Sequence, residues 1–176
     1  MRIDAFETER LVHRPLTLDD LNGLAPLYGD AATVRYVGTG RIRTRDETQH
    51  LLEFFITQYK KHGVGLFATV EKASARLIGR CGFSVWNEGS EREIELELLI
   101  ADASRGQGYA TEAARGFLAQ AAAHLAFATP YVVTFIHPAN AAGVRVAHKA
   151  GMTFWQERVL SGIATHAYRL DLPHGK

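Results

Sequence analysis

Three strand-like runs in the middle of the chain constrain its fold most. Leu66 to Val70, Leu77 to Trp86 and Glu93 to Ile100 are rich in apolar residues, and the last run alternates charged and apolar residues. The turns between them, Lys72 to Ala75 and Asn87 to Ser90, are short. Connections this short join antiparallel neighbours, because a parallel pair needs a much longer crossover. We therefore expect an antiparallel meander from about residue 65 to residue 100.

A first strand and two helices are expected before the meander. Arg10 to Arg14 is apolar in its middle and is followed by a proline, which is typical of a short strand. Thr17 opens a capping box in which Asp20 takes the place of glutamate, and Thr44 with Glu47 forms a second one. A loop containing residues 38–41 lies between the two helices. The apolar residues at helical spacing are Leu18, Leu21, Leu24 and Leu27 in the first helix, and Leu51, Leu52, Phe55, Ile56 and Tyr59 in the second.

The C-terminal half is predicted to form a helix, a strand, a capped helix and a hairpin. The expected elements are an alanine-rich helix from the turn at residues 105–108 through Leu125, a strand at 131–136, a helix from its cap Asn140 to Ala150 with Gly151 just past its end, and strands at 152–160 and 163–170 around Ser161-Gly162. The expected core residues of the alanine-rich helix are Ala110, Ala114, Phe117, Ala121 and Leu125. The whole order is β-α-α-β-β-β-α-β-α-β-β. It predicts an α/β fold with a mixed sheet and helices on its faces, in one domain spanning residues 1–176.

Composition and charge exclude several classes of protein. The 176 residues include 20 Lys+Arg and 19 Asp+Glu, so a net charge of +1 supplies no general field for nucleic acid or an anionic membrane. The most apolar stretch, 113–133, is interrupted by polar residues and a proline, which excludes a membrane span. Cys81 is the only cysteine and is expected to be a small core residue. The sequence contains no HExxH, GxSxG or GxxxxGK[ST] motif, and we expect no metal site. We also expect a cytoplasmic protein.

The segment RGQGYATEA, from Arg105 to Ala113, carries the strongest local signal. A glycine-bearing turn before a helix exposes backbone N–H groups, and the helix N-terminus adds a partial positive charge, so this turn can hold a pyrophosphate. Gly108 lets its backbone approach a ligand without a Cβ. Taken alone, the turn fits equally well a strand-to-helix connection that only needs glycine. The segment 63–68 also fits GxGxxA, but it follows a helix and enters a strand, the reverse of a dinucleotide-binding site.

Three separated motifs resemble those of the GCN5-related N-acetyltransferase (GNAT) superfamily, and within it the branch of the ribosomal-protein-alanine acetyltransferases. Arg105-x-x-Gly108-x-Ala110 is similar to the acyl-CoA motif at every defined position. Residues 8–37 resemble the opening segments of this branch, and HPAN with KAGM, within 137–152, resembles the helix beside the pantetheine. The resemblance spans about residues 7 to 170. It implies the GNAT fold and acetyl-CoA as co-substrate.

The resemblance also implies which residues bind acetyl-CoA. The strand before the turn splays from its neighbour and offers backbone groups to the thioester and pantetheine, and Asn140 meets the pantetheine or the thiol. Relatives often carry a serine or a tyrosine that protonates the thiolate, at positions where this chain has Gly143 and Ala147, and neither can donate a side-chain proton. The implied cofactor-binding residues are Leu98, Leu99, Ile100, Arg105, Gly106, Gln107, Gly108, Tyr109, Ala110, Thr111 and Asn140.

Glu93, Glu95 and Glu97 alternate along one strand, with successive members about 7 Å apart. Like charges at that range raise carboxylate pKa values towards those of a useful base. For Glu93 we expect a solvated strand face. The resemblance implies that Glu95 faces the acyl centre, which makes it a candidate general base, and Glu97 is a second catalytic candidate where relatives often have glycine. A solvated face stays the alternative for both.

These observations lead us to expect an N-acetyltransferase that moves an acetyl group from acetyl-CoA directly to a primary amine. Positive charge from Arg35, Arg41, Arg43 and Arg45 near the expected acceptor region disfavours polycationic acceptors, so a peptide N-terminus or a small neutral or anionic amine is expected. Two tryptophans, at positions 86 and 155, either line the acceptor pocket or pack on the sheet. The alternative function is a non-catalytic acyl-CoA-binding or sensing domain, which the missing side-chain acid favours. A homodimer is a possible assembly.

Overall fold

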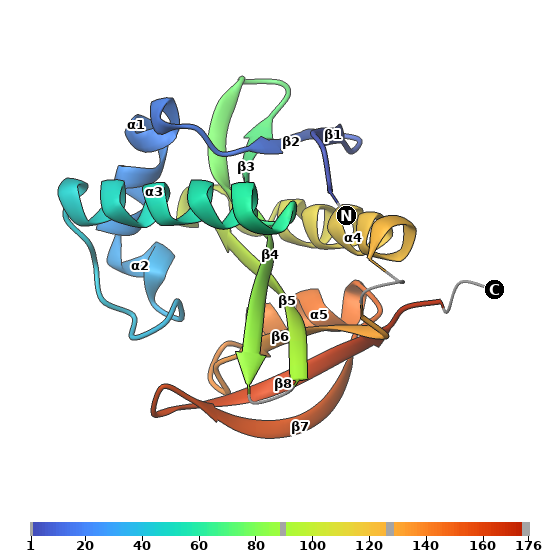
Figure 1. The fold of residues 1–176 in the computed structure, drawn as a ribbon. Coiled ribbons are helices and arrows are strands. Elements are labelled where there is room, and N and C mark those ends of the chain that lie inside the picture. The colour runs from blue at the N-terminus through green and yellow to red at the C-terminus, as the bar shows by residue number, and fades with distance from the viewer. Residues whose placement is uncertain (1, 89–90, 126–128, 174–176) are drawn as a thin grey trace.

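The computed structural model describes residues 2–88, 91–125 and 129–173. Its elements follow in chain order (Figure 1): β1 (Phe6–Glu7), β2 (Leu11–Pro15), the 3-10 turn η1 (Leu18–Asp20), α1 (Leu21–Gly29), α2 (Ala31–Val34), α3 (Arg45–His62), β3 (Leu66–Glu71), β4 (Arg76–Glu88), β5 (Glu91–Ile100), the 3-10 turn η2 (Asp102–Ser104), α4 (Tyr109–His124), β6 (Tyr131–Ile136), α5 (Ala141–Lys149), β7 (Thr153–Leu160) and β8 (Ile163–Asp171).

One mixed sheet organises the described residues, with its strands in the order β1-β2-β3-β4-β5-β6-β8-β7. β3, β4 and β5 pair as antiparallel neighbours, which confirms the expected meander. β7 and β8 form the expected closing hairpin. Its turn residues Ser161 and Gly162 have φ values of +49° and +81°, the left-handed conformation that a two-residue hairpin turn of type I′ requires.

The junction between β5 and β6 is the one parallel pairing in this sheet. Its register consists of a single residue pair, Glu95 opposite Val133. Beyond that pair, the edge of β5 that faces away from β4 has no strand partner within residues 2–88, 91–125 and 129–173. The expected splay of this strand from its neighbour is therefore confirmed, and it leaves backbone groups of the last residues of β5 open to a ligand.

Helices cover both faces of the sheet, as expected from the α/β pattern. Strand β3 shows why, because its successive side chains point to opposite faces. Leu66 and Ala68 join a core with α1 and α3, whereas Phe67 packs in a second core with α4. Phe117 of α4 lies at the centre of this second core, where its ring meets the Phe67 ring edge-on with centroids 5.5 Å apart. Figure 1 shows α5 with β6, β7 and β8 in the lower part of the view, to which the lower ends of β4 and β5 also extend.

Local capping signals specify the helix ends well. At the start of α3, the Glu47 backbone N–H donates to Thr44 Oγ1 at 3.2 Å, and the Thr44 N–H donates to Glu47 Oε2 at 2.8 Å. This is the predicted capping box. Asp20 accepts from the Thr17 backbone N–H at 2.9 Å, as predicted for the first box. Helix α3 ends at Gly63, whose φ is +70°.

The structure corrects several details of the expected elements. β1 was not expected, and the connection between the two predicted helices contains α2, which begins where Asp30 accepts the backbone N–H groups of Ala32 and Thr33. Leu18 is exposed because it lies in η1 rather than in α1. Ala110 is half-buried and lines a cleft rather than the core. Part of the expected turn at residues 87–90 lies outside the described residues.

Three further observations concern the classes of protein considered from the sequence: the burial of Cys81, the length and polarity of the helices, and the grouping of possible metal ligands. Cys81 is fully buried, and burial raises the pKa of its thiol, so it is a core residue as expected. Every helix in the described part of the chain is too short or too polar to cross a bilayer. Within residues 2–88, 91–125 and 129–173, no three His, Cys, Asp or Glu side chains gather closely enough to hold a metal ion.

Candidate active site

A cleft of about 580 Å³ opens where β5 and β6 separate. Its walls come from the end of β5, the turn before α4, the first turn of α4, the end of β6, helix α5 and the segment that follows α2. The cleft gathers nearly all the residues predicted for the site, and only Gln107 is absent from its lining. The Gln107 carbonyl instead accepts a hydrogen bond from Arg10 Nη1 at 2.9 Å. The predicted residues that line it are Glu95, Glu97, Leu98, Leu99, Ile100, Arg105, Gly106, Gly108, Tyr109, Ala110, Thr111 and Asn140.

The turn before α4 presents a run of backbone N–H groups. The first helical hydrogen bond of α4 runs from the Glu112 N–H to the Gly108 carbonyl at 3.0 Å. For the N–H groups of residues 106–111, no acceptor is found among the described residues. Free N–H groups at a helix N-terminus, together with the helix macrodipole, form a binding site for an anion.

Two glycines shape this turn. Gly106 and Gly108 have φ values of +79° and +86°, which disfavour any residue with a Cβ. A Cβ at Gly106 would meet no atom within 4 Å, and at Gly108 the nearest atom would be Arg10 Nη2 at 3.4 Å. The protein therefore leaves open the space in front of these glycines. Backbone conformation, rather than crowding by other residues, requires glycine at both positions.

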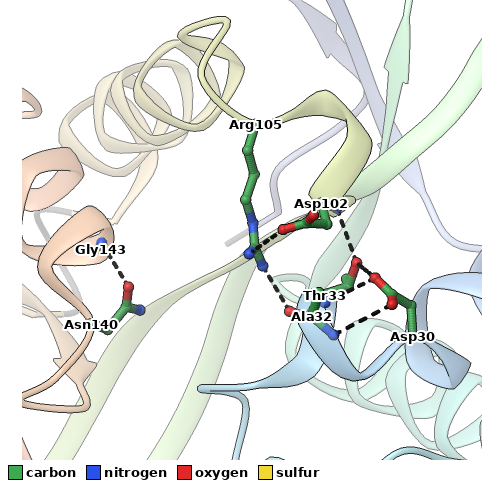
Figure 2. Close-up of polar contacts among 7 residues, drawn as sticks. All are labelled: Asp30, Ala32, Thr33, Asp102, Arg105, Asn140 and Gly143. Carbon is green, nitrogen blue, oxygen red and sulfur yellow. Dashed lines mark hydrogen bonds and ion pairs between the residues drawn. The ribbon is translucent and has the colours of Figure 1, made fainter.

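Arg105 anchors the turn to the segment around α2, as Figure 2 shows. Its Nη1 lies 2.7 Å from Asp102 Oδ1, and its Nη2 donates to the Thr33 carbonyl at 2.9 Å. The Asp102 N–H donates to Thr33 Oγ1 at 2.9 Å, and Thr33 in turn bonds to the cap residue Asp30. The guanidinium predicted to bind the cofactor thus uses two of its nitrogens to hold the wall of the cleft together.

Glu93, Glu95 and Glu97 of β5 have different environments. Glu93 is buried, and its carboxylate pairs with Arg158 Nη1 at 2.5 Å and accepts from the Tyr131 hydroxyl at 3.1 Å. The expected solvated face is therefore wrong for Glu93, because β6 and β7 bring their own polar side chains over this end of β5. Glu97 is half-buried, accepts from the Ser84 hydroxyl and pairs with Arg80 Nη2 at 3.0 Å.

Glu95 combines burial with a place in the cleft. Only 8% of its surface is exposed. Trp86 Nε1 donates to Glu95 Oε2 at 2.5 Å, and the Phe135 backbone N–H also donates to this carboxylate. Burial and the neighbouring charge of Glu97 raise the pKa of Glu95 well above its usual value, although these two donors and Arg80 oppose the rise. A raised pKa makes the carboxylate a stronger base once it is ionised.

Asn140 caps α5 and lines the cleft. Its Oδ1 accepts from the Gly143 N–H at 2.9 Å and so caps α5 (Figure 2). A Cβ at Gly143 would lie only 2.7 Å from Asn140 Nδ2, so glycine at this position makes room for the amide. Gly143 and Ala147 both line the cleft, which leaves the wall at these two positions without a proton donor.

Several cleft residues escaped the sequence analysis. Arg80, on β4, has only 3% of its surface exposed and lines the cleft. Tyr36 and His137 also line it, and their rings pack with centroids 5.4 Å apart, joining the α2 side to the α5 side. Trp86 reaches the site through Glu95, whereas Trp155 packs against the Tyr131 ring, with centroids 5.5 Å apart. These residues come from distant segments of the chain and meet only in the folded protein, so no local motif marks them.

Comparison with known proteins identifies the family. Residues 10–153 match the acetyltransferase (GNAT) domain family. That match covers most of the chain, so the protein belongs to the GNAT acetyltransferase family. It is an acetyltransferase, and acetyl-CoA is its acetyl donor.

Individual relatives are more distant. The chain is 27% identical over 128 residues to uncharacterized protein YkkB of Bacillus subtilis (strain 168), a match that covers 73% of this chain and 72% of YkkB. An acetyltransferase from Agrobacterium tumefaciens str. C58 has a TM-score of 0.76 at 23% identity, over 97% of this chain and 95% of that chain. RimL, a ribosomal L7/L12 alpha-N-protein acetyltransferase solved with coenzyme A, has a TM-score of 0.80 at 13% identity, over 96% and 98%. These structures show that the fold is shared.

Proposed function

We propose that this enzyme transfers the acetyl group of acetyl-CoA directly to a primary amine, with residues 105–111 holding the donor and Glu95 removing the proton of the acceptor. The observation that carries the proposal is that one cleft joins a row of free backbone N–H groups, an unpaired edge of β5 and a buried carboxylate. Direct transfer needs these three features in one place. Family membership favours this enzyme over the non-catalytic alternative.

The donor side of the cleft is built from backbone groups. We propose that the N–H groups of residues 106–111 bind the pyrophosphate of acetyl-CoA, since they have no acceptor among the described residues. The free edge of Leu98, Leu99 and Ile100 is placed to bond the pantetheine and the thioester carbonyl. Asn140 Nδ2 adds a donor from the opposite wall, because the cap uses only Oδ1.

The chemical step requires an amine that has lost its proton. A lysine-like amine has a pKa of about 10.4 and a peptide α-amine about 7.7–8.0, so both are largely protonated near neutral pH. In our proposal Glu95 accepts this proton, directly or through a water. The neutral amine nitrogen then forms a bond to the acetyl carbon, the carbon–sulfur bond breaks, and the electron pair leaves on sulfur. The nitrogen carries a positive charge after this attack, and it loses its second proton to the departing thiolate, directly or through water, to give the amide and free CoA. Gly143 and Ala147 have no side-chain donor, so neither residue protonates the thiolate.

Glu97 is the less suitable base of the two candidates. Both of its oxygens have partners, in Ser84 and Arg80. Taking up a proton would weaken the ion pair with Arg80. We therefore propose that Glu97 holds Arg80 and supports the raised pKa of Glu95 through its charge.

For the acceptor, we propose a peptide N-terminus or a small neutral or anionic amine. Arg80 places a buried positive charge in the cleft, which opposes the binding of polycationic amines. The fold shared with RimL, a ribosomal-protein acetyltransferase, is compatible with a peptide acceptor. Acetylation of a panel of peptides and small amines tests this, and activity confined to cationic drugs would contradict it.

A thermal shift with acetyl-CoA tests the donor site. At about 100 times the dissociation constant, binding stabilises the fold by about 2.7 kcal/mol, which raises the melting temperature of a chain of this size by roughly 5–11 °C. We expect Gly108→Val to abolish the rise. Gly162→Val is the matched control, because Gly162 also has a positive φ and an open Cβ position but lies in the hairpin turn. A rise that survives Gly108→Val would contradict the assigned donor site.

A further inference from the structure

Arg80 is charged, almost fully buried and incompletely bonded. It lies on β4 with 3% of its surface exposed. Its Nε donates to the Tyr28 hydroxyl at 2.7 Å, and its Nη2 pairs with Glu97 Oε2 at 3.0 Å. Its Nη1 is buried and has no hydrogen-bond partner among the residues that the structure describes. Leaving a buried charged donor unpaired is costly, so such a group calls for a partner.

The surroundings of Arg80 favour an anionic partner. The Arg43 guanidinium carbon lies 5.3 Å from the centre of the Tyr28 ring, and Arg43 Nη1 is also buried without a partner. Two guanidinium groups therefore approach Tyr28, and Glu97 is the only carboxylate with an ion pair to either of them in the described structure. The Phe55 ring, 5.4 Å from the Arg80 guanidinium carbon, closes the apolar side.

Arg80 also belongs to the reaction cleft, since it is one of the residues that line it. Its ion-pair partner Glu97 is two residues from Glu95, about 7 Å further along β5, so Arg80 lies beside the next carboxylate of the strand. An acceptor whose amine meets Glu95 would therefore place an atom several bonds away beside Arg80.

On the basis of the proposed function, we infer that the acceptor is an amine that also carries a carboxylate several bonds from its nitrogen, and that Arg80 Nη1 binds this carboxylate. The amine end lies at Glu95 and the acid end at Arg80. Its Nη1 suits this role because a hydrogen bond from a charged guanidinium to a carboxylate is stronger than one between neutral groups. This makes Arg80 a specificity-determining residue for the transfer.

A matched pair of acceptors tests the inference. The dipeptide Ala-Gly and its amide Ala-Gly-NH₂ have the same amine and differ in the terminal carboxylate. We expect the wild-type kcat/KM to be at least about tenfold higher for the acid, as for a charged hydrogen bond. Arg80→Gln should reduce this ratio to nearly one. Arg76→Gln is the control, because Arg76 lies on the same strand but is exposed, and it should keep the ratio.

The outcomes separate this inference from the proposed function. Equal rates for the two acceptors in the wild type, or a preference that survives Arg80→Gln, would overturn the role of Arg80 while leaving the acetyltransferase proposal intact. Acetyl-CoA binding with no acetylation of either dipeptide would overturn it as well. If Arg80→Gln does not fold, Arg80→Lys decides, because it keeps the charge but loses the planar guanidinium, and the inference expects a reduced acid preference. Failure of acetyl-CoA to bind the wild type would instead contradict the proposed function.

Discussion

The two sides of the cleft consist of different chemical groups. In our proposal the donor side consists of backbone groups, namely the N–H groups of residues 106–111 and the free edge of β5. The proposed acceptor side consists of side chains, among them the buried Glu95 and Arg80 and the half-buried Glu97. Backbone groups present the same chemistry in every family member, whereas side chains can change one at a time. This division fits a family that shares one donor.

The two sides also differ in how their charges are held. The helix N-terminus contributes only a partial positive charge at the donor side. Along β5, full charges are held in ion pairs, Glu97 with Arg80 in the cleft and Glu93 with Arg158 beside it. Glu95 lies between them without a cationic partner at ion-pair distance among the described residues, so burial raises its pKa. A substitution that removes a side chain of the proposed acceptor side should therefore slow the chemical step and leave the binding of acetyl-CoA unchanged.

Among the substitutions that test this division between donor binding and chemistry, Glu95→Gln is expected to have the largest effect. A positioned base contributes roughly 10²–10⁴-fold to a rate, so we expect kcat to fall at least about tenfold. Glutamine can still accept the hydrogen bonds of Trp86 and Phe135, so the fold and the acetyl-CoA affinity should change little. Steady-state kinetics with an active amine measure the loss.

Glu97→Gln is the control for that experiment. It removes a charge from the same strand without removing the proposed base. A larger loss of kcat in Glu97→Gln than in Glu95→Gln would reverse the roles that we assign to the two carboxylates.

The next effect is on the pH dependence of kcat/KM. A base must be ionised to act, so activity should fall as the pH drops below the pKa of Glu95, which burial and Glu97 raise. The hydrogen bond from Trp86 lowers this pKa, and its removal in Trp86→Phe should raise it. The acid limb of the profile should therefore move to higher pH. A limb that stays in place, or moves to lower pH, would contradict the assignment of that limb to Glu95.

The smallest effect is expected at the donor side, from Asn140→Asp. Aspartate keeps the oxygen that caps α5 through the Gly143 N–H, so the melting temperature should not fall. It replaces the Nδ2 donor, and loss of one hydrogen bond should raise the KM for acetyl-CoA by roughly 2–10-fold. Initial-rate kinetics with varied acetyl-CoA measure this. An unchanged KM would show that Asn140 serves only as a cap.

The sequence predicted which residues line the proposed donor side of the cleft much better than those of the proposed acceptor side. Motif letters such as Arg105, Gly108 and Ala110 lie within one turn, and capping residues such as Thr44 act on neighbours in the chain, so local patterns reveal both. The meander was predictable for the same reason, because its connections are short. The family resemblance supplied Glu95.

The acceptor side depends on contacts between distant segments. Arg80 meets Tyr28 and Glu97 only after the sheet has formed, and Glu93 is buried by residues of β6 and β7. An arginine on an alternating strand gives no local sign that it will be buried. The order β6-β8-β7 at the sheet edge is likewise fixed by long-range pairing.

The central claim is that donor binding and proton removal reside in separate parts of the cleft. The most direct test is the dissociation constant of acetyl-CoA, measured by titration calorimetry for Gly108→Val and Glu95→Gln beside the wild type. We predict that binding is lost in Gly108→Val and unchanged in Glu95→Gln. Wild-type affinity in Gly108→Val, or loss of binding in a folded Glu95→Gln, would contradict the division that we describe.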